Sequence, residues 1–236
     1  DDAKYQCQVS TGPKGEPAIR SRYAQLTVLV PPEPPKILQG NFYSTTEDRH
    51  IKLECVSVGG KPPAEITWVD SNAGVITQGV TYSVEPLSDS QRFTARSVLK
   101  LTPKEEHHNQ TYTCQAQNTA DRAYRAASIK IEVKYAPKVK IHVRNGMKKK
   151  VPEGEDVIIE CKADANPSNL TYKWFLNEKV MTEETGLILK ILNVSRKYND
   201  VIIKCEVHND VGKSEDTVIM EVTYAPTFRN RPKDVE

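Results

Sequence analysis

The stretch Glu54–Trp68, ECVSVGGKPPAEITW, places a cysteine and a tryptophan 13 residues apart. The same spacing separates Cys161 from Trp174. Each pair is followed by one more cysteine, Cys114 and Cys205 respectively. A Cys–Trp–Cys order of this kind is typical of an immunoglobulin-type β-sandwich, in which the tryptophan packs on a disulfide between two sheets. The sequence therefore predicts tandem sandwiches with Cys55–Cys114 and Cys161–Cys205 disulfides, and with Trp68 and Trp174 in the two cores.

Hydrophobic residues alternate with polar ones around both first cysteines. Ile51, Leu53 and Cys55 alternate with Lys52 and Glu54, and Val157, Ile159 and Cys161 repeat the period. A period of two places one set of side chains on the buried face of a strand. The fold class that this predicts is all-β, with tandem immunoglobulin-like sandwiches of the I-set or C2 type.

An internal repeat gives the expected domain boundaries. The tripeptide Tyr-Ala-Pro at 135–137 recurs at 224–226, each time after an alternating segment (128–133 and 218–222). We interpret each copy as a junction between the last strand of one domain and the first strand of the next. The expected segments are the C-terminal strands of a truncated domain (1–30), two complete domains (31–134 and 135–223) and the start of a further one (224–236).

Composition narrows the functional class. The 236 residues have a formal net charge of +2, which is too small to indicate nucleic acid as the main partner. No apolar run is long enough to span a membrane. Two long-range disulfides indicate an oxidising compartment.

The fifth cysteine, Cys7, follows the pattern D-x-A-x-Y-x-C. This pattern resembles the approach to the second cysteine of an immunoglobulin domain, with Tyr5 as its buried tyrosine-corner residue. The partner of Cys7 is then expected upstream of residue 1, and the alternative is a free reactive thiol. Tyr112, two residues before Cys114, is expected in the core in the same way, whereas Ile203 takes that place in the later domain.

Two polar clusters are candidate sites of chemistry. Lys104–His108 contains adjacent histidines, but the segment lacks the H-E-x-x-H spacing and fits a solvated turn. The sequence also lacks a G-x-S-x-G element and a phosphate-binding glycine loop, so no catalytic residue, metal or cofactor is predicted. Arg144 and Lys148–Lys150 form a basic loop, either a solvated hairpin or a contact for heparan sulfate or another acidic partner.

Three sequons, at Asn109, Asn169 and Asn193, lie beside expected turns. They make these asparagines candidate N-glycosylation sites and agree with an extracellular location. The sequon-like Asn166-Pro167-Ser168 is blocked by its proline.

Several stretches are more specific than a general immunoglobulin pattern. They are DAKYQCQV at 2–9, LTVLVPPE at 26–33, ECVSVGGKPPAEITW at 54–68, the CQAQNTADR segment ending at 122, KADANPS at 162–168, VGKSE at 211–215 and the two Tyr-Ala-Pro junctions. Over essentially its whole length the chain resembles the arthropod Kirre (Dumbfounded) and Roughest family of irre-cell-recognition adhesion receptors, whose vertebrate relatives are the nephrin-like Kirrel proteins.

The resemblance implies a single-pass receptor on the extracellular side of the plasma membrane, with five immunoglobulin domains. It implies binding to itself and to nephrin-type receptors on facing cells, in myoblast recognition before fusion, in axon and eye patterning, and in slit-type junctions. No small-molecule substrate is implied. The family uses the front sheet of its first domain for this contact.

On the strands that remain of that domain, Gln6, Gln8, Tyr23 and Gln25 are the expected partner-binding residues. Ordinary polar strand surface is the alternative interpretation of these four residues. Two other functions remain open from the sequence: a structural spacer array, and the ectodomain of a ligand-binding signalling receptor.

Overall fold

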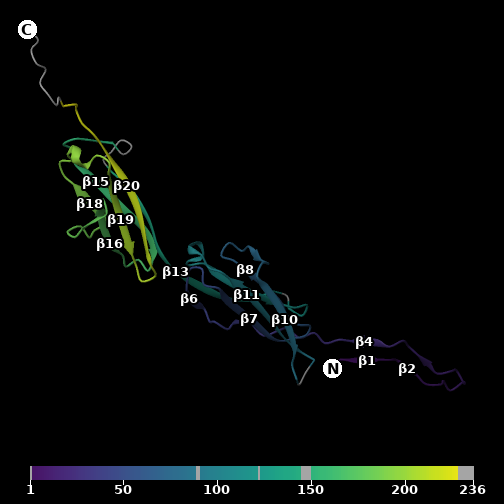
Figure 1. The fold of residues 1–236 in the computed structure, drawn as a ribbon. Helices are drawn as coiled ribbons and strands as arrows, with labels where there is room; N and C mark the ends of the chain where they lie inside the picture. The colour runs from purple at the N-terminus through teal and green to yellow at the C-terminus, as the bar shows by residue number, and fades with distance from the viewer. Residues whose placement is uncertain (1, 89–90, 122, 145–149, 228–236) are drawn as a thin grey trace, which may run out of the picture. The chain divides into compact units, whose positions relative to one another are not determined.

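In a computed structural model of the chain, two compact units are formed, Asp1–Glu132 and Val133–Glu236, called here the first and second units. The structure describes residues 2–88, 91–121, 123–144 and 150–227. Strands dominate both units, and the expected all-β fold of tandem immunoglobulin-like sandwiches is confirmed (Figure 1).

The first unit begins with two short strand pairs and continues into a sandwich. Its elements are β1 (Ala3–Tyr5), β2 (Gln8–Val9), β3 (Ile19–Arg20), β4 (Ala24–Leu26), β5 (Lys36–Ile37), β6 (Phe42–Thr46), β7 (Ile51–Gly60), β8 (Glu65–Val69), β9 (Val75–Ile76), β10 (Val80–Pro86), β11 (Phe93–Leu101), the 3₁₀ turn η1 (Glu105–His107), β12 (Thr111–Gln117) and the first part of β13 (Arg125–Val143).

Two sheets face each other in this sandwich. One has the order β10-β11-β7-β5, and the other runs β9-β8-β12-β13, with β6 paired to β13. Along β7 the buried Ile51, Leu53 and Cys55 alternate with less buried neighbours. This is the pleat that the sequence predicted, and it directs one face of the sheet into the core.

The second unit has the same plan. Besides the later part of β13, its elements are β14 (Lys150–Pro152), β15 (Val157–Asn166), β16 (Thr171–Leu176), β17 (Lys179–Met181), β18 (Ile188–Ile191), the 3₁₀ turn η2 (Arg196–Tyr198), β19 (Val201–His208) and β20 (Lys213–Thr223). The sheet β14-β20-β19-β16-β17 packs against the strands β13-β15-β18. A single cluster of buried side chains, centred on Trp174 and the disulfide, fills the space between them.

Strand β13 is longer than the sequence suggested. It extends through the Tyr-Ala-Pro junction, and its early residues pair with β12 while its later residues pair with β15. The register with β15 shifts between Tyr135 and Lys138. Pro137 lies inside this irregular segment, where a residue without a backbone N–H removes no regular ladder bond.

Candidate functional site

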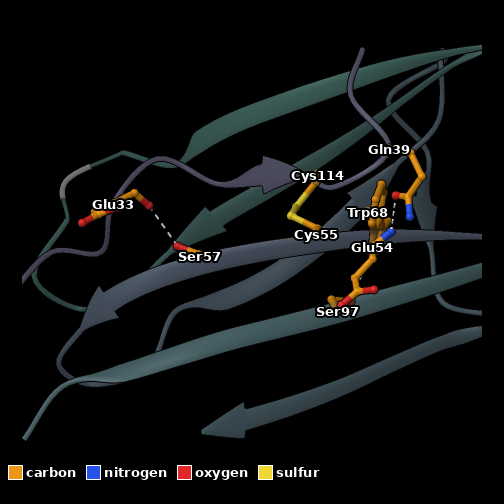
Figure 2. Close-up of a disulfide and its surroundings, with 8 residues drawn as sticks. All are labelled: Glu33, Gln39, Glu54, Cys55, Ser57, Trp68, Ser97 and Cys114. Atoms are coloured by element: carbon orange, nitrogen blue, oxygen red, sulfur yellow. Dashed lines mark hydrogen bonds between the residues drawn. A yellow bond between two sulfur atoms is a disulfide. The ribbon is translucent and has the colours of Figure 1, made fainter. Parts of the chain in front are cut away.

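The core of the first unit is built around a disulfide and a tryptophan (Figure 2). Cys55 is bonded to Cys114, and Trp68 lies directly opposite Cys114 in the neighbouring strand. The indole N–H of Trp68 donates to Ser97 Oγ at 3.1 Å, and both side chains are fully buried. Burial of Ser97 costs little free energy because its hydroxyl has a hydrogen-bond partner.

The second unit repeats the arrangement with a different acceptor. Cys161 is bonded to Cys205, and Trp174 lies opposite Cys205. Here the indole N–H donates to the backbone carbonyl of Gly186 at 2.8 Å. Each core therefore combines a disulfide with a buried tryptophan whose indole N–H has a hydrogen-bond partner.

The two tyrosines expected in the cores behave differently. Tyr112 is buried, and desolvation is the main reason that its pKa is raised. Tyr5 is 52% exposed within this chain, and its place in the core of a complete domain stays a prediction. Within the described residues β1 pairs only with β4, and a two-stranded ribbon has no opposing sheet to cover either of its faces.

The four expected partner-binding residues lie in or beside the two short strand pairs β1–β4 and β2–β3, which together are called the ribbon here. Gln8 Nε2 donates to Gln6 Oε1 at 2.9 Å, and Gln6 Nε2 donates to the Ser21 carbonyl at 2.9 Å. Gln25 pairs with Lys4 across β1 and β4, so strand alternation places it on the face of Gln6 and Tyr23. Tyr23 is 66% exposed. The structure therefore places these four side chains along one polar strip, which also carries the cations Lys4, opposite Gln25, and Arg20, opposite Gln8.

Cys7 lies in the same ribbon and is an exposed free thiol within this chain. Its backbone N–H is bonded to Ser21 Oγ at 3.0 Å, and its carbonyl accepts from Ser21 N at 2.9 Å.

The three sequon asparagines Asn109, Asn169 and Asn193 are all exposed. Asn109 and Asn193 have left-handed backbones, with φ of 64° and 49°. Such conformations are typical of turn asparagines, so each amide can point into solvent as glycan attachment requires.

The two polar clusters have ordinary structural contacts. His107 Nδ1 accepts from the backbone N–H of Lys104 at 2.8 Å at the start of η1. The described residues contain no group of His, Cys, Asp and Glu side chains that could hold a metal. In the basic loop, Arg144 is bonded to Glu160 at 2.9 Å and Lys150 lies 3.8 Å from Glu221. Lys148 and Lys149 lie outside the described residues.

A repeated asparagine is a structural feature that our sequence analysis missed. Asn118 Nδ2 donates to the carbonyls of Val30 and Pro62, each at 2.8 Å. Asn209 Nδ2 donates in the same way to Tyr135 and Pro167, at 2.9 and 3.2 Å. Each asparagine lies four residues after the second cysteine of its domain, and this repeated spacing was the available signal.

A nearly buried carboxylate on the β19–β20 face is a second missed feature. Glu206 accepts from Lys213 Nζ at 2.9 Å and contacts His208 Nε2 at 2.7 Å, and its side chain is 10% exposed. The hydrogen bond from Lys213, followed by that from His208, lowers the pKa of Glu206 to about 2. Glu206 and His208 lie on the same strand, but only the pairing of β19 with β20 brings Lys213 beside them, so the cluster is not apparent from sequence alone.

This cluster predicts a specific pH dependence. The pKa of Glu206 is depressed from 4.5 to about 2 on folding, so its stabilising contribution is present above pH 4.5 and is lost as the pH falls towards 2. We expect wild type to lose about 1–3 kcal/mol more unfolding free energy than Glu206→Gln over this interval. Chemical denaturation at a series of pH values measures the difference. The matched control Glu221→Gln, at a half-exposed position of β20, should follow wild type, and equal pH profiles for all three proteins would contradict the prediction.

The comparisons with known proteins agree with this architecture. A model described as a CD80-like C2-set immunoglobulin domain matches residues 33–125, and an immunoglobulin domain model matches residues 137–209. The Irregular chiasm C-roughest protein of Drosophila melanogaster is 53% identical over 100% of this chain and 34% of its own length. Human Kin of IRRE-like protein 3 is 32% identical over 100% of this chain and 29% of its own.

The chain belongs to the Roughest/Kirre family. Human nephrin is a more distant relative of this family member, at 26% identity over 96% of the chain and 19% of nephrin. The chain spans about a third of the length of the Roughest and Kin of IRRE-like relatives that it matches.

Two solved structures are also similar. The crystal structure of Rst D1-D2 matches with 65% identity and a TM-score of 0.55, over 56% of this chain and 64% of that chain. The full ectodomain of mouse nectin-like molecule 4 has a TM-score of 0.63 over 94% of this chain and 73% of that one. At 20% identity, this second similarity shows the immunoglobulin fold alone.

Proposed function

We propose that this chain is part of the ectodomain of a cell-adhesion receptor that binds nephrin-type immunoglobulin receptors and further copies of itself on facing cells. The observation that carries the proposal is the 53% identity to the Roughest protein along the whole chain. Myoblast recognition before fusion, axon and eye patterning, and slit-type junctions are the processes that fit such a receptor.

We place the chain on the extracellular side of the plasma membrane. Two disulfides within one chain support an oxidising compartment. The three exposed sequons give N-glycans accessible attachment points. In the described part of the chain no helix is both long and apolar enough to cross a bilayer.

Residues 1–30 are proposed to be strands of a further immunoglobulin domain. The ribbon exposes Tyr5, Val9 and Leu26, by 52%, 57% and 48% respectively. In a complete sandwich a second sheet covers an apolar face of this kind. The polar strip of Gln6, Gln8, Tyr23 and Gln25 lies on the opposite face, where it is free to contact a partner.

The chemistry of this strip suits a reversible contact. Amide groups can donate and accept hydrogen bonds, and a tyrosine adds contact area with little conformational freedom to lose. The Gln8–Gln6–Ser21 chain of hydrogen bonds holds two amides in place before binding, which lowers the entropic cost of association.

The test uses the full-length receptor on cells or its complete soluble ectodomain. Gln6→Ala and Gln8→Glu are each expected to weaken binding to a nephrin-type ectodomain by about 1–3 kcal/mol, because hot spots cluster at the centre of an interface. Surface plasmon resonance gives the affinities, and mixed-cell aggregation tests adhesion. Lys150→Gln is the control and should bind like wild type. If Lys150→Gln loses binding while both glutamine variants keep it, the proposed strip is not the contact.

A further inference from the structure

A row of basic side chains lies along the later part of β13. Lys138, Lys140 and His142 of this strand, and Arg144 directly after its end, are all exposed, and the alternation places them on one face. At a rise of about 3.3 Å per residue, neighbours in the row are roughly 6.6 Å apart and the whole row is about 20 Å long.

The neighbouring strands widen this row into a basic face. Lys162 of β15 lies directly opposite Lys140, and Lys190 of β18 lies opposite Ile158. Both lysines are exposed. We call the set Lys138, Lys140, His142, Arg144, Lys162 and Lys190 the basic face.

Acidic groups offset only part of this charge. Glu160, opposite His142, accepts two hydrogen bonds from Arg144, at 2.9 and 3.0 Å. Asp164, opposite Lys138, accepts from the Tyr135 hydroxyl at 3.2 Å. Asp216 Oδ2 accepts from the backbone N–H of Ile141 at 2.8 Å, between Lys140 and His142. The five cationic side chains of the face therefore outnumber the carboxylates of Glu160, Asp164 and Asp216 beside them.

Within the basic face, Lys140 and Lys162 lie directly opposite each other on neighbouring strands. Like charges directly opposite each other on antiparallel strands repel, and they destabilise the pair relative to neutral residues. Glu160, two residues before Lys162 on the same strand, is hydrogen-bonded to Arg144, and the charge of Lys162 makes a smaller contribution to the lowered pKa of Glu160. A ligand with repeated negative charges would relieve this repulsion when it binds.

We propose that the basic face binds a linear sulfated polysaccharide. The cations lie in a row on an open sheet, so they match a polymer with evenly repeated charges better than a single phosphate, which needs converging donors. The face carries no exposed Phe, Tyr or Trp among the described residues, so it lacks the stacking platforms of a single-strand nucleic-acid site. The choice of a polysaccharide rests on the extracellular location given under the proposed function.

The direct test compares binding of the whole chain to immobilised heparin and to a sulfonate exchanger. Lys140→Gln/Lys162→Gln should elute from heparin at clearly lower NaCl than wild type. The slope of log affinity for soluble heparin against log salt concentration should fall by about 2, because two fewer counterions are released from the polyanion. The matched control is Lys52→Gln/Lys100→Gln, which neutralises a directly opposed lysine pair of β7 and β11 in the first unit. This control variant should elute at a slightly lower NaCl concentration than wild type, and the decrease should be the same on heparin and on the sulfonate exchanger.

Three results would overturn the proposal. They are equal loss of heparin retention in the two double variants, no stronger retention of wild type on heparin than on the exchanger, and binding to phosphatidylserine vesicles without binding to heparin. Circular dichroism checks that each variant is folded, and the single change Lys190→Gln gives a second measurement with a smaller shift of the same sign. None of these measurements needs a partner receptor, so their failure is distinct from failure of the adhesion proposal.

Discussion

Replacing Cys161 and Cys205 together by alanine is expected to lower the free energy of unfolding of the second unit by about 2–5 kcal/mol. The bond joins residues 44 apart in sequence, and closing a loop of that length restricts the unfolded chain by roughly 4 kcal/mol in the chain-entropy model. The side chains of both cysteines are fully buried beside Trp174, so alanine also leaves part of the core unfilled.

Differential scanning calorimetry of the purified chain measures this effect. The transition of the second unit should move to lower temperature, while the transition of the first unit, which contains Cys55–Cys114, stays in place. Cys7→Ala is the control, and a change of less than about 0.5 kcal/mol is expected because this thiol is exposed. Wild-type stability in the Cys161→Ala/Cys205→Ala protein would contradict the sandwich core.

Asn209→Ala is expected to destabilise the second unit by about 2–4 kcal/mol, a large effect for a partly buried side chain. The amide nitrogen holds the carbonyls of Tyr135 and Pro167, and its oxygen accepts from the backbone N–H groups of Val211 and Gly212, each at 3.0 Å. Alanine leaves these four backbone groups without that partner. Buried polar groups that lack a hydrogen-bond partner lower the free energy of unfolding.

Two companion variants sharpen this prediction. Asn209→Asp keeps an acceptor for the two N–H groups but sets a carboxylate against two carbonyl oxygens, so it should be at least as destabilising as alanine. Asn72→Ala, in an exposed turn of the first unit, should change stability by less than about 0.5 kcal/mol. Urea denaturation gives the three values. An Asn209→Ala protein as stable as Asn72→Ala would show that the four backbone groups find equal partners elsewhere.

Local patterns determined the class of fold in advance. A strand exposes its side chains with a period of two, so Ile51, Leu53 and Cys55 could be assigned to one face from sequence alone. The spacing from Cys55 to Trp68, and from Cys161 to Trp174, reflects the short connection that carries the chain from a strand of one sheet to a strand of the facing sheet, which is also a local property. The family resemblance rested on similarly continuous segments, and the comparisons confirmed it.

Only the tertiary structure decided the features that depend on which strands become neighbours. Tyr5 has the sequence context of a core residue, yet it is exposed because a two-stranded ribbon provides no second layer. Asn209 bonds to residues 74 and 42 positions away, and Lys140 lies opposite Lys162 only through the register of β13 with β15. Glu206 is nearly buried and has a lowered pKa, and the main cause of this shift is the hydrogen bond from Lys213 on the neighbouring strand β20. Sequence periodicity defines the faces of a strand but not its partner, so cross-strand contacts and the resulting pKa values require the assembled sheet.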